Sequence, residues 1–104
     1  MVKKSRRQHR KALEIYEQLK LERDAAYDYH QLGRVAQERN QLDQAEQWYR
    51  EALEIFERLG YPPLKVDTLA QFGLFWKQRE DFRAALIAFV AALGIAVQYR
   101  MPVG

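Results

Sequence analysis

Few residues in this chain could act as a nucleophile or hold a metal ion. Its 104 residues include no cysteine, which excludes a thiolate nucleophile, a thiolate metal site and a disulfide. One serine, Ser5, and one threonine, Thr68, could supply a hydroxyl, and Ser5 has His9 four residues away. That spacing is too common within helices to mark a catalytic pair. His9 and His30 have no further histidine at ligand spacing, so the sequence predicts no metal site.

Carboxylates and glycines also fail to form a recognisable site. The pairs Glu51/Glu54 and Glu80/Asp81 fall on expected solvent-facing positions or turns, where such charges usually serve solvation. The five glycines are isolated, so there is no loop that could hold a phosphate group. We therefore expect no enzymatic activity, no cofactor and no metal, and we look to binding for the function.

The positive charge of the chain is concentrated at its start. Seventeen Lys and Arg against fourteen Asp and Glu give a net charge of +3, but the first eleven residues hold six bases and no acid. These bases are Lys3, Lys4, Arg6, Arg7, Arg10 and Lys11. The rest of the chain is therefore mildly acidic. A solvated helix end is the simplest interpretation, and a nucleic-acid contact through this arm is less favoured because the arm has no aromatic side chain for stacking.

A membrane span is not expected. The longest uncharged stretch, 84–99, has sixteen residues, whereas a spanning helix needs about twenty. A buried helix explains this stretch better, and the absence of cysteine favours the cytoplasm.

The sequence repeats itself with a period of forty residues. ALEIYEQL at 12–19 recurs as ALEIFERL at 52–59, and the register 12–60 on 52–100 has thirteen identities in forty-nine positions. Apolar and small residues recur three, four and seven apart in each unit, which is the pattern of amphipathic helices, and no alternating stretch predicts a strand. We expect an all-α domain over 12–104 preceded by the basic arm 1–11, with repeats at 24–60 and 64–100 and a half repeat at 3–21. The predicted helices are 3–21, 23–39, 42–59, 64–79 and 82–99.

Two glycines in the middle of predicted helices indicate close packing. Gly33 and Gly73 occupy equivalent positions, where glycine costs about 1 kcal/mol relative to alanine. A closely crossing partner helix would offset this cost. We expect Ala45 and Ala85 to face the glycines at these crossings. Larger side chains should fill the surrounding space, namely Leu32, Tyr49, Phe72 and Phe89.

The repeated pattern resembles the tetratricopeptide repeat. It reads Tyr29-x2-Leu32-Gly33-x2-Ala36 followed by Ala45-x3-Tyr49-x2-Ala52, and its copy runs from Leu69 to Ala92. The period of forty is similar to that of the long-loop subclass found in kinesin light chains and in bacterial regulatory proteins. The resemblance implies a right-handed α-solenoid of antiparallel helix pairs, about two and a half repeats long. It also implies a scaffold that binds a protein or peptide and is part of a larger bacterial signalling protein.

In such a solenoid, the first helix of each repeat lines the concave surface that usually binds the ligand. The candidate positions lie three or four residues apart on each helix, with one glutamine beside them. They are Tyr27, His30, Gln31, Arg34 and Gln37, then Asp67, Ala70, Gln71, Leu74 and Lys77. Tyr27, His30 and Arg34 are the preferred contacts, since aromatic and arginine side chains are enriched at binding hot spots.

The last predicted helix is apolar on all sides, which favours a second kind of contact. Each large apolar side chain left in water forgoes about 1.5–3 kcal/mol, and not all of those in this helix can face inward. The residues expected to be covered by another copy of the chain, or by further repeats of a longer protein, are Leu86, Ile87, Val90, Ile95 and Val97. A self-assembly module that forms a homo-oligomer through this helix is therefore the alternative to a groove-binding scaffold.

Overall fold

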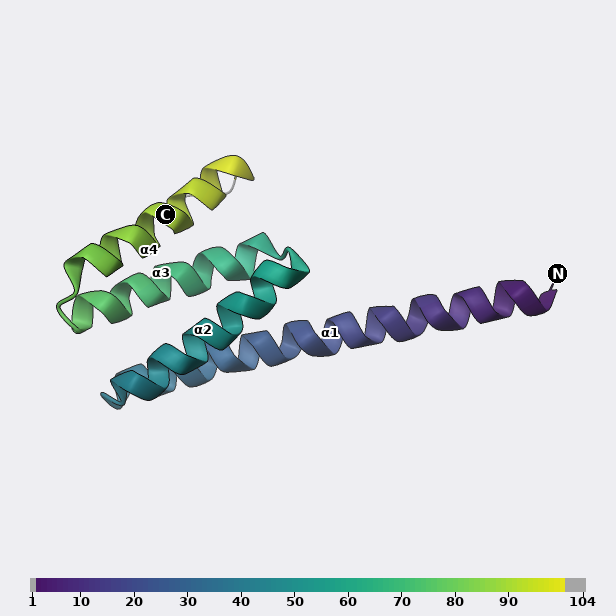
Figure 1. The fold of residues 1–104 in the computed structure, drawn as a ribbon, viewed down its shortest axis with the longest axis horizontal. Coiled ribbons are helices and arrows are strands. Elements are labelled where there is room, and N and C mark those ends of the chain that lie inside the picture. Colours follow the sequence, from purple (N-terminus) through teal and green to yellow (C-terminus); the bar gives the residue numbers. More distant parts are fainter. Residues whose placement is uncertain (1, 101–104) are drawn as a thin grey trace.

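Residues 2–100 form four α-helices that follow one another along the chain. The computed structural model describes the backbone of residues 2–100 and the side chains of residues 8–100. Within this range there are no strands, and the helices are α1 (Val2–Glu38), α2 (Leu42–Leu59), α3 (Pro62–Gln78) and α4 (Phe82–Gln98). Helices α2, α3 and the second half of α1 pack together, α4 covers α3, and the first half of α1 projects away from the other helices (Figure 1).

A residue with positive φ follows each helix, and these residues are twenty positions apart. Asn40 (58°), Glu80 (62°) and Arg100 (53°) share this left-handed conformation with Gly60 (65°). At the end of α2, the backbone N–H groups of Gly60 and Tyr61 bond to the carbonyls of Glu57 and Phe56. Pro62 then begins α3, where its missing N–H costs nothing. The turns predicted after residues 39, 59 and 79 are confirmed.

The predicted break between helices 3–21 and 23–39 is wrong, because both segments belong to the continuous helix α1. Residues 2–100 therefore form four helices instead of five. The reason is local: positions 20–23 read Lys-Leu-Glu-Arg, four residues that helices accept, whereas the equivalent positions 60–63 read Gly-Tyr-Pro-Pro. The predicted turn has no residue that stops the helix.

The core is aromatic and lies between α1, α2 and α3. One cluster contains Ala36, Ala45, Tyr49, Phe72 and Phe75, and a second contains Ala26, Ala52 and Phe56. The rings of Tyr49, Phe72 and Phe75 lie 5.5–6.0 Å apart, within the range of favourable aromatic pairs.

The two mid-helix glycines allow an aromatic ring to lie directly against the helix backbone. A Cβ atom on Gly33 would lie 2.7 Å from the ring of Tyr49, and one on Gly73 would lie 2.6 Å from the ring of Phe89. The predicted close crossings are therefore confirmed. Ala45 and Ala85 are buried, but the side chains nearest the two glycines are the rings of Tyr49 and Phe89 and not the alanines expected there. Leu32 was expected to fill the space at the first crossing but is 44% exposed, because no helix covers that side of α1.

Helix α4 packs through alanines and leaves its large side chains outside. Ala85, Ala88, Ala92 and Ala96 are buried. Leu86, Ile87, Val90 and Val97 are 59–65% exposed, as the sequence predicts. Ile95 differs: it is half-buried and lines a pocket beside Phe56 and Tyr61, so it does not belong to the exposed face. Among the described residues, no helix combines the length and the apolar character that crossing a membrane requires.

Candidate functional site

Helices α1 and α3, the first helices of the two repeats, are joined by a network of glutamine side chains. Gln37 lies at its centre: its Oε1 accepts a hydrogen bond from the Tyr49 hydroxyl (2.6 Å) and another from Gln71 Nε2 (3.1 Å). Its Nε2 donates to Gln78 Oε1 (3.1 Å), and Gln78 Nε2 in turn approaches Asn40 Oδ1 (3.4 Å). The network therefore fixes the position of one repeat against the next.

A second polar contact joins the same two helices about two turns away. The Thr68 hydroxyl donates to the carbonyl of Leu64 (2.7 Å), so its oxygen accepts a hydrogen bond from Nδ1–H of His30 (2.9 Å). This pairing assigns the proton of the neutral imidazole to Nδ1. In the part of the chain whose side chains are described, every buried side-chain nitrogen and oxygen has a hydrogen-bond partner. We call the solvent-facing side of these two helices the α1/α3 surface. The buried polar groups that join the helices are its floor.

Burial and the positive charge of Arg34 both lower the pKa of His30 below its ordinary value of 6.5, and Asp67 offsets part of this shift. The unfolded chain takes up a proton near pH 6.5, whereas the folded chain resists protonation. We therefore expect the free energy of unfolding to be fully retained above that pH and to fall as the pH decreases below it. Urea unfolding of the wild type and of His30→Gln at pH 8 and pH 5.5 would measure this. A pH dependence as steep in the variant as in the wild type would contradict it.

Five of the ten predicted groove residues are exposed above this floor. Tyr27 (44% exposed) and Arg34 lie on α1, and Asp67, Leu74 (46% exposed) and Lys77 lie on α3. Tyr27 stacks on His30 with ring centroids 6.5 Å apart, and its hydroxyl accepts a hydrogen bond from Gln31 Nε2 (2.7 Å). The exposed set therefore combines apolar side chains with both signs of charge on α1 and α3.

The other five predicted groove residues are buried or half-buried. His30 and Gln37 are buried and serve the contact between repeats, which corrects their expected role as ligand contacts. Gln31, Ala70 and Gln71 are half-buried. Sequence reasoning also missed Thr68 as a buried partner of His30. The available signal was their separation of 38 residues, close to the repeat period, which places them on adjacent equivalent helices.

Trp48 of α2 is half-buried and packs against α1. It stacks on Tyr29 with ring centroids 5.4 Å apart, and both line an open pocket with Gln47, Arg50 and Glu51. Within the described residues, no group of three or more His, Asp or Glu side chains is placed to hold a metal ion.

Comparison with known proteins agrees with this architecture. The family model described as "Tetratricopeptide repeat" matches residues 2–58, more than half of the chain. No curated protein and no solved structure matches it. The match, the forty-residue repeat and the helix pairs in which an aromatic ring packs on a glycine establish that the chain belongs to the tetratricopeptide repeat family.

Proposed function

We propose that this protein is an interaction scaffold that binds a peptide or helix of a partner protein across the α1/α3 surface. Tetratricopeptide repeats generally mediate protein–protein interactions and are typically not enzymes. One observation carries the proposal: Tyr27, Arg34, Asp67, Leu74 and Lys77 are exposed above a floor of buried, hydrogen-bonded side chains. A rigid floor reduces the ordering cost that a binding surface pays when it meets its ligand.

The chemistry of this surface defines the kind of partner it would accept. Tyr27 and Leu74 offer apolar area, while Arg34 and Lys77 offer hydrogen-bond donors with positive charge. Within residues 8–100, neither Arg34 nor Lys77 forms a salt bridge to another side chain. An amphipathic segment with acidic residues on one side fits this arrangement.

Two groove substitutions test the proposal. Peptides selected from a random library on the wild-type protein would be measured by fluorescence anisotropy against Arg34→Glu and Tyr27→Ala. We expect each variant to bind at least about tenfold more weakly, which corresponds to about 1.4 kcal/mol. Arg83→Glu, a matched charge reversal on the exposed start of α4, should bind as the wild type does. Unchanged affinity in both groove variants would reject this surface.

The repeat period also bears on the subclass and on the shape of the repeats. We propose that the protein belongs to the long-loop subclass, because its period is forty residues, and that its repeats form a right-handed superhelix. We further place it in the cytoplasm, as part of a larger bacterial regulatory or signalling protein, without catalysis, a cofactor or a nucleic-acid ligand of its own. The absence of cysteine is consistent with that compartment.

Self-assembly through α4 is the second candidate function. The supporting observation is the exposure of Leu86, Ile87, Val90 and Val97, with Leu93 half exposed beside them. Single exposed apolar residues are common on protein surfaces, but here several are exposed on one helix. Exposed apolar patches of this kind mark protein contacts. The variant Leu86→Glu with Val90→Glu would dissociate a dimer formed through this face, as measured by sedimentation equilibrium.

A further inference from the structure

Most of the first half of α1 extends away from the other helices (Figure 1). Each described residue from His9 to Leu21 is exposed, including Leu13 (57%), Tyr16 (64%) and Leu19 (47%). The repeat register makes this segment equivalent to 49–61, which covers most of α2 and its turn. In α2, the counterparts of His9, Ala12 and Tyr16, which are Tyr49, Ala52 and Phe56, are buried in the core. We call residues 2–21 the N-terminal arm. This arm has the apolar face with which the second helix of a repeat packs, and in this structure that face is exposed to solvent.

The surface that this arm should cover is also open, on the second half of α1. Leu32 and Val35 are 44% and 43% exposed, whereas their counterparts on α3, Phe72 and Phe75, are buried against α2. The chain thus exposes two surfaces that would normally pack together between neighbouring repeats: the apolar face of the arm and the face of α1 with Leu32 and Val35.

Two equivalent hollows support this pairing. In the second repeat, Arg50 and Leu53 of α2 line a hollow together with Leu69, Ile87, Ala88 and Ala91. Forty residues earlier, Tyr29, Gln47, Trp48 and Glu51 line an open pocket at the corresponding place. The residues equivalent to Arg50 and Leu53 are Arg10 and Leu13, and both are on the arm. The arm therefore carries the residues that would complete the wall of this pocket.

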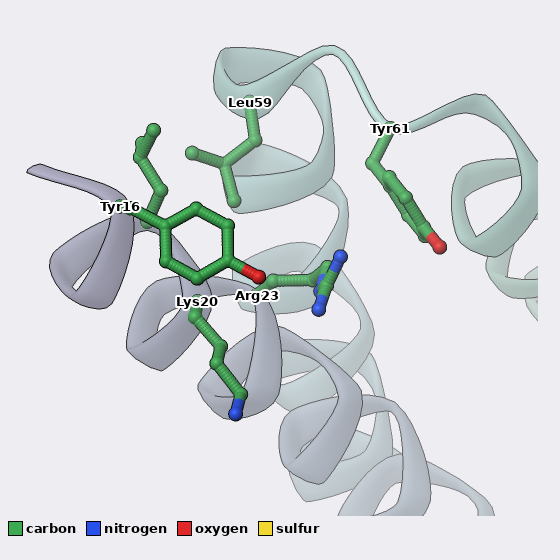
Figure 2. Close-up of a pocket in the computed structure, with 6 residues that line it drawn as sticks. Tyr16, Lys20, Arg23, Leu59 and Tyr61 are labelled. Atoms are coloured by element: carbon green, nitrogen blue, oxygen red, sulfur yellow. The ribbon is translucent and has the colours of Figure 1, made fainter. Parts of the chain in front are cut away.

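The arm cannot reach this surface in its own chain while α1 is straight. Glu22 pairs with Arg58 (3.0 Å), and the guanidinium of Arg23 lies 5.3 Å from the centroid of the Tyr61 ring, so the uninterrupted region is held against the end of α2. Figure 2 shows the residues that line a hollow at the base of the arm, where the ring of Tyr16 lies beside Leu59 and Lys20 points away from it. Lys20 lies twenty residues before Asn40, the first of the evenly spaced residues with positive φ. At Lys20, however, the helix continues without a turn.

We propose that two copies of this chain exchange their N-terminal arms, so that the arm of each copy packs antiparallel on Leu32 and Val35 of the other. A hairpin that opens into one straight helix leaves both complementary faces available, and this is the usual route to exchanged dimers. The resulting interface is two-fold symmetric, with its axis near residues 21–22. Charge favours the exchange as well, because a strongly basic arm meets a body that carries net negative charge.

Restoring the missing turn tests the proposal. Lys20→Gly, Glu22→Pro and Arg23→Pro together copy the residues that end α2, so the arm should fold back within its own chain. By sedimentation equilibrium at tens of micromolar, we expect the wild type to be a dimer and this variant a monomer with similar helical content. The matched control places alanine at the same three positions, keeps the helix straight and should remain a dimer. A monomeric wild type, or a dimer that persists in the turn variant, would overturn the exchange.

Cross-linking provides a test that does not depend on the turn variant folding. Leu53 and Phe72 line one hollow, so their counterparts Leu13 and Leu32 should meet across the two copies. Within one straight helix they are about 28 Å apart, at 1.5 Å per residue. A bismaleimide much shorter than this should therefore join Leu13→Cys/Leu32→Cys chains into covalent dimers on a denaturing gel, and neither single variant should do so. An internal cross-link within a monomer would refute the exchange. So would a dimer that is lost in Leu86→Glu/Val90→Glu, because the contact would then lie on α4.

Discussion

Replacing Tyr49 by alanine is expected to lower the free energy of unfolding by about 3–5 kcal/mol, the range found for large aromatic side chains in cores. Tyr49 is fully buried, and its ring contacts His30, Phe72 and Phe75 at centroid distances of 5.6–6.2 Å. It therefore joins three helices, so the cavity cannot close by the movement of one of them. Urea denaturation followed by circular dichroism would measure the loss. A decrease below about 1 kcal/mol, within the range of surface substitutions, would contradict it.

Tyr49→Phe separates the contribution of the hydroxyl from that of the ring. The variant keeps the aromatic packing but removes the hydrogen bond to Gln37 Oε1, which still accepts one from Gln71. We expect a loss of about 1 kcal/mol, the usual net value of one hydrogen bond. Burial raises the pKa of Tyr49 to about 12, so the folded wild type should lose stability as the pH rises from 10 toward 12. The phenylalanine variant should lack this component of the alkaline decrease.

The extent to which the sequence predicts this fold depends on the residues at each turn. Gly60 accepts the left-handed conformation that ends α2, and the prolines after it fix φ at the start of α3, so the boundaries of both helices were predicted to within two residues. The segment 20–23 has the same place in the repeat but no such residues, so the inference from the period failed there. A repeat pattern predicts which faces are apolar, whereas the turn residues decide whether the chain folds back on itself.

The candidate surface was predictable in position but not in detail. Tyr27, Arg34 and Lys77 are exposed, as helical spacing predicts. This spacing could not show that His30 would reach Thr68 or that Gln37 would reach Tyr49, because both contacts depend on how closely α1 approaches α3 and α2. Long polar side chains can either line a groove or join two helices. The distance between the helices decides between these roles, and one repeat in isolation does not contain that information.

Substituting alanine for three mid-helix glycines should change stability in a graded order, from gain to loss. All three substitutions gain about 1 kcal/mol of helix propensity, so differences between them report packing alone. A Cβ atom on Gly94 would have no neighbouring atom within 4 Å, and Gly94→Ala should therefore stabilise the protein. Gly73→Ala meets the ring of Phe89, which is 36% exposed and can turn toward solvent, so its effect should be intermediate.

Gly33→Ala should be the most destabilising of the series. Its new Cβ would lie 2.7 Å from the ring of Tyr49, which is fully buried and held through its hydroxyl by Gln37. The ring cannot rotate away, so α1 and α2 must separate, at an overpacking cost of about 1–3 kcal/mol relative to Gly94→Ala. Thermal unfolding of the three variants under one buffer would give the order directly. If Gly33→Ala were as stable as Gly94→Ala, the close approach of α1 and α2 would not be a constraint, and the position of Tyr49 would need another explanation.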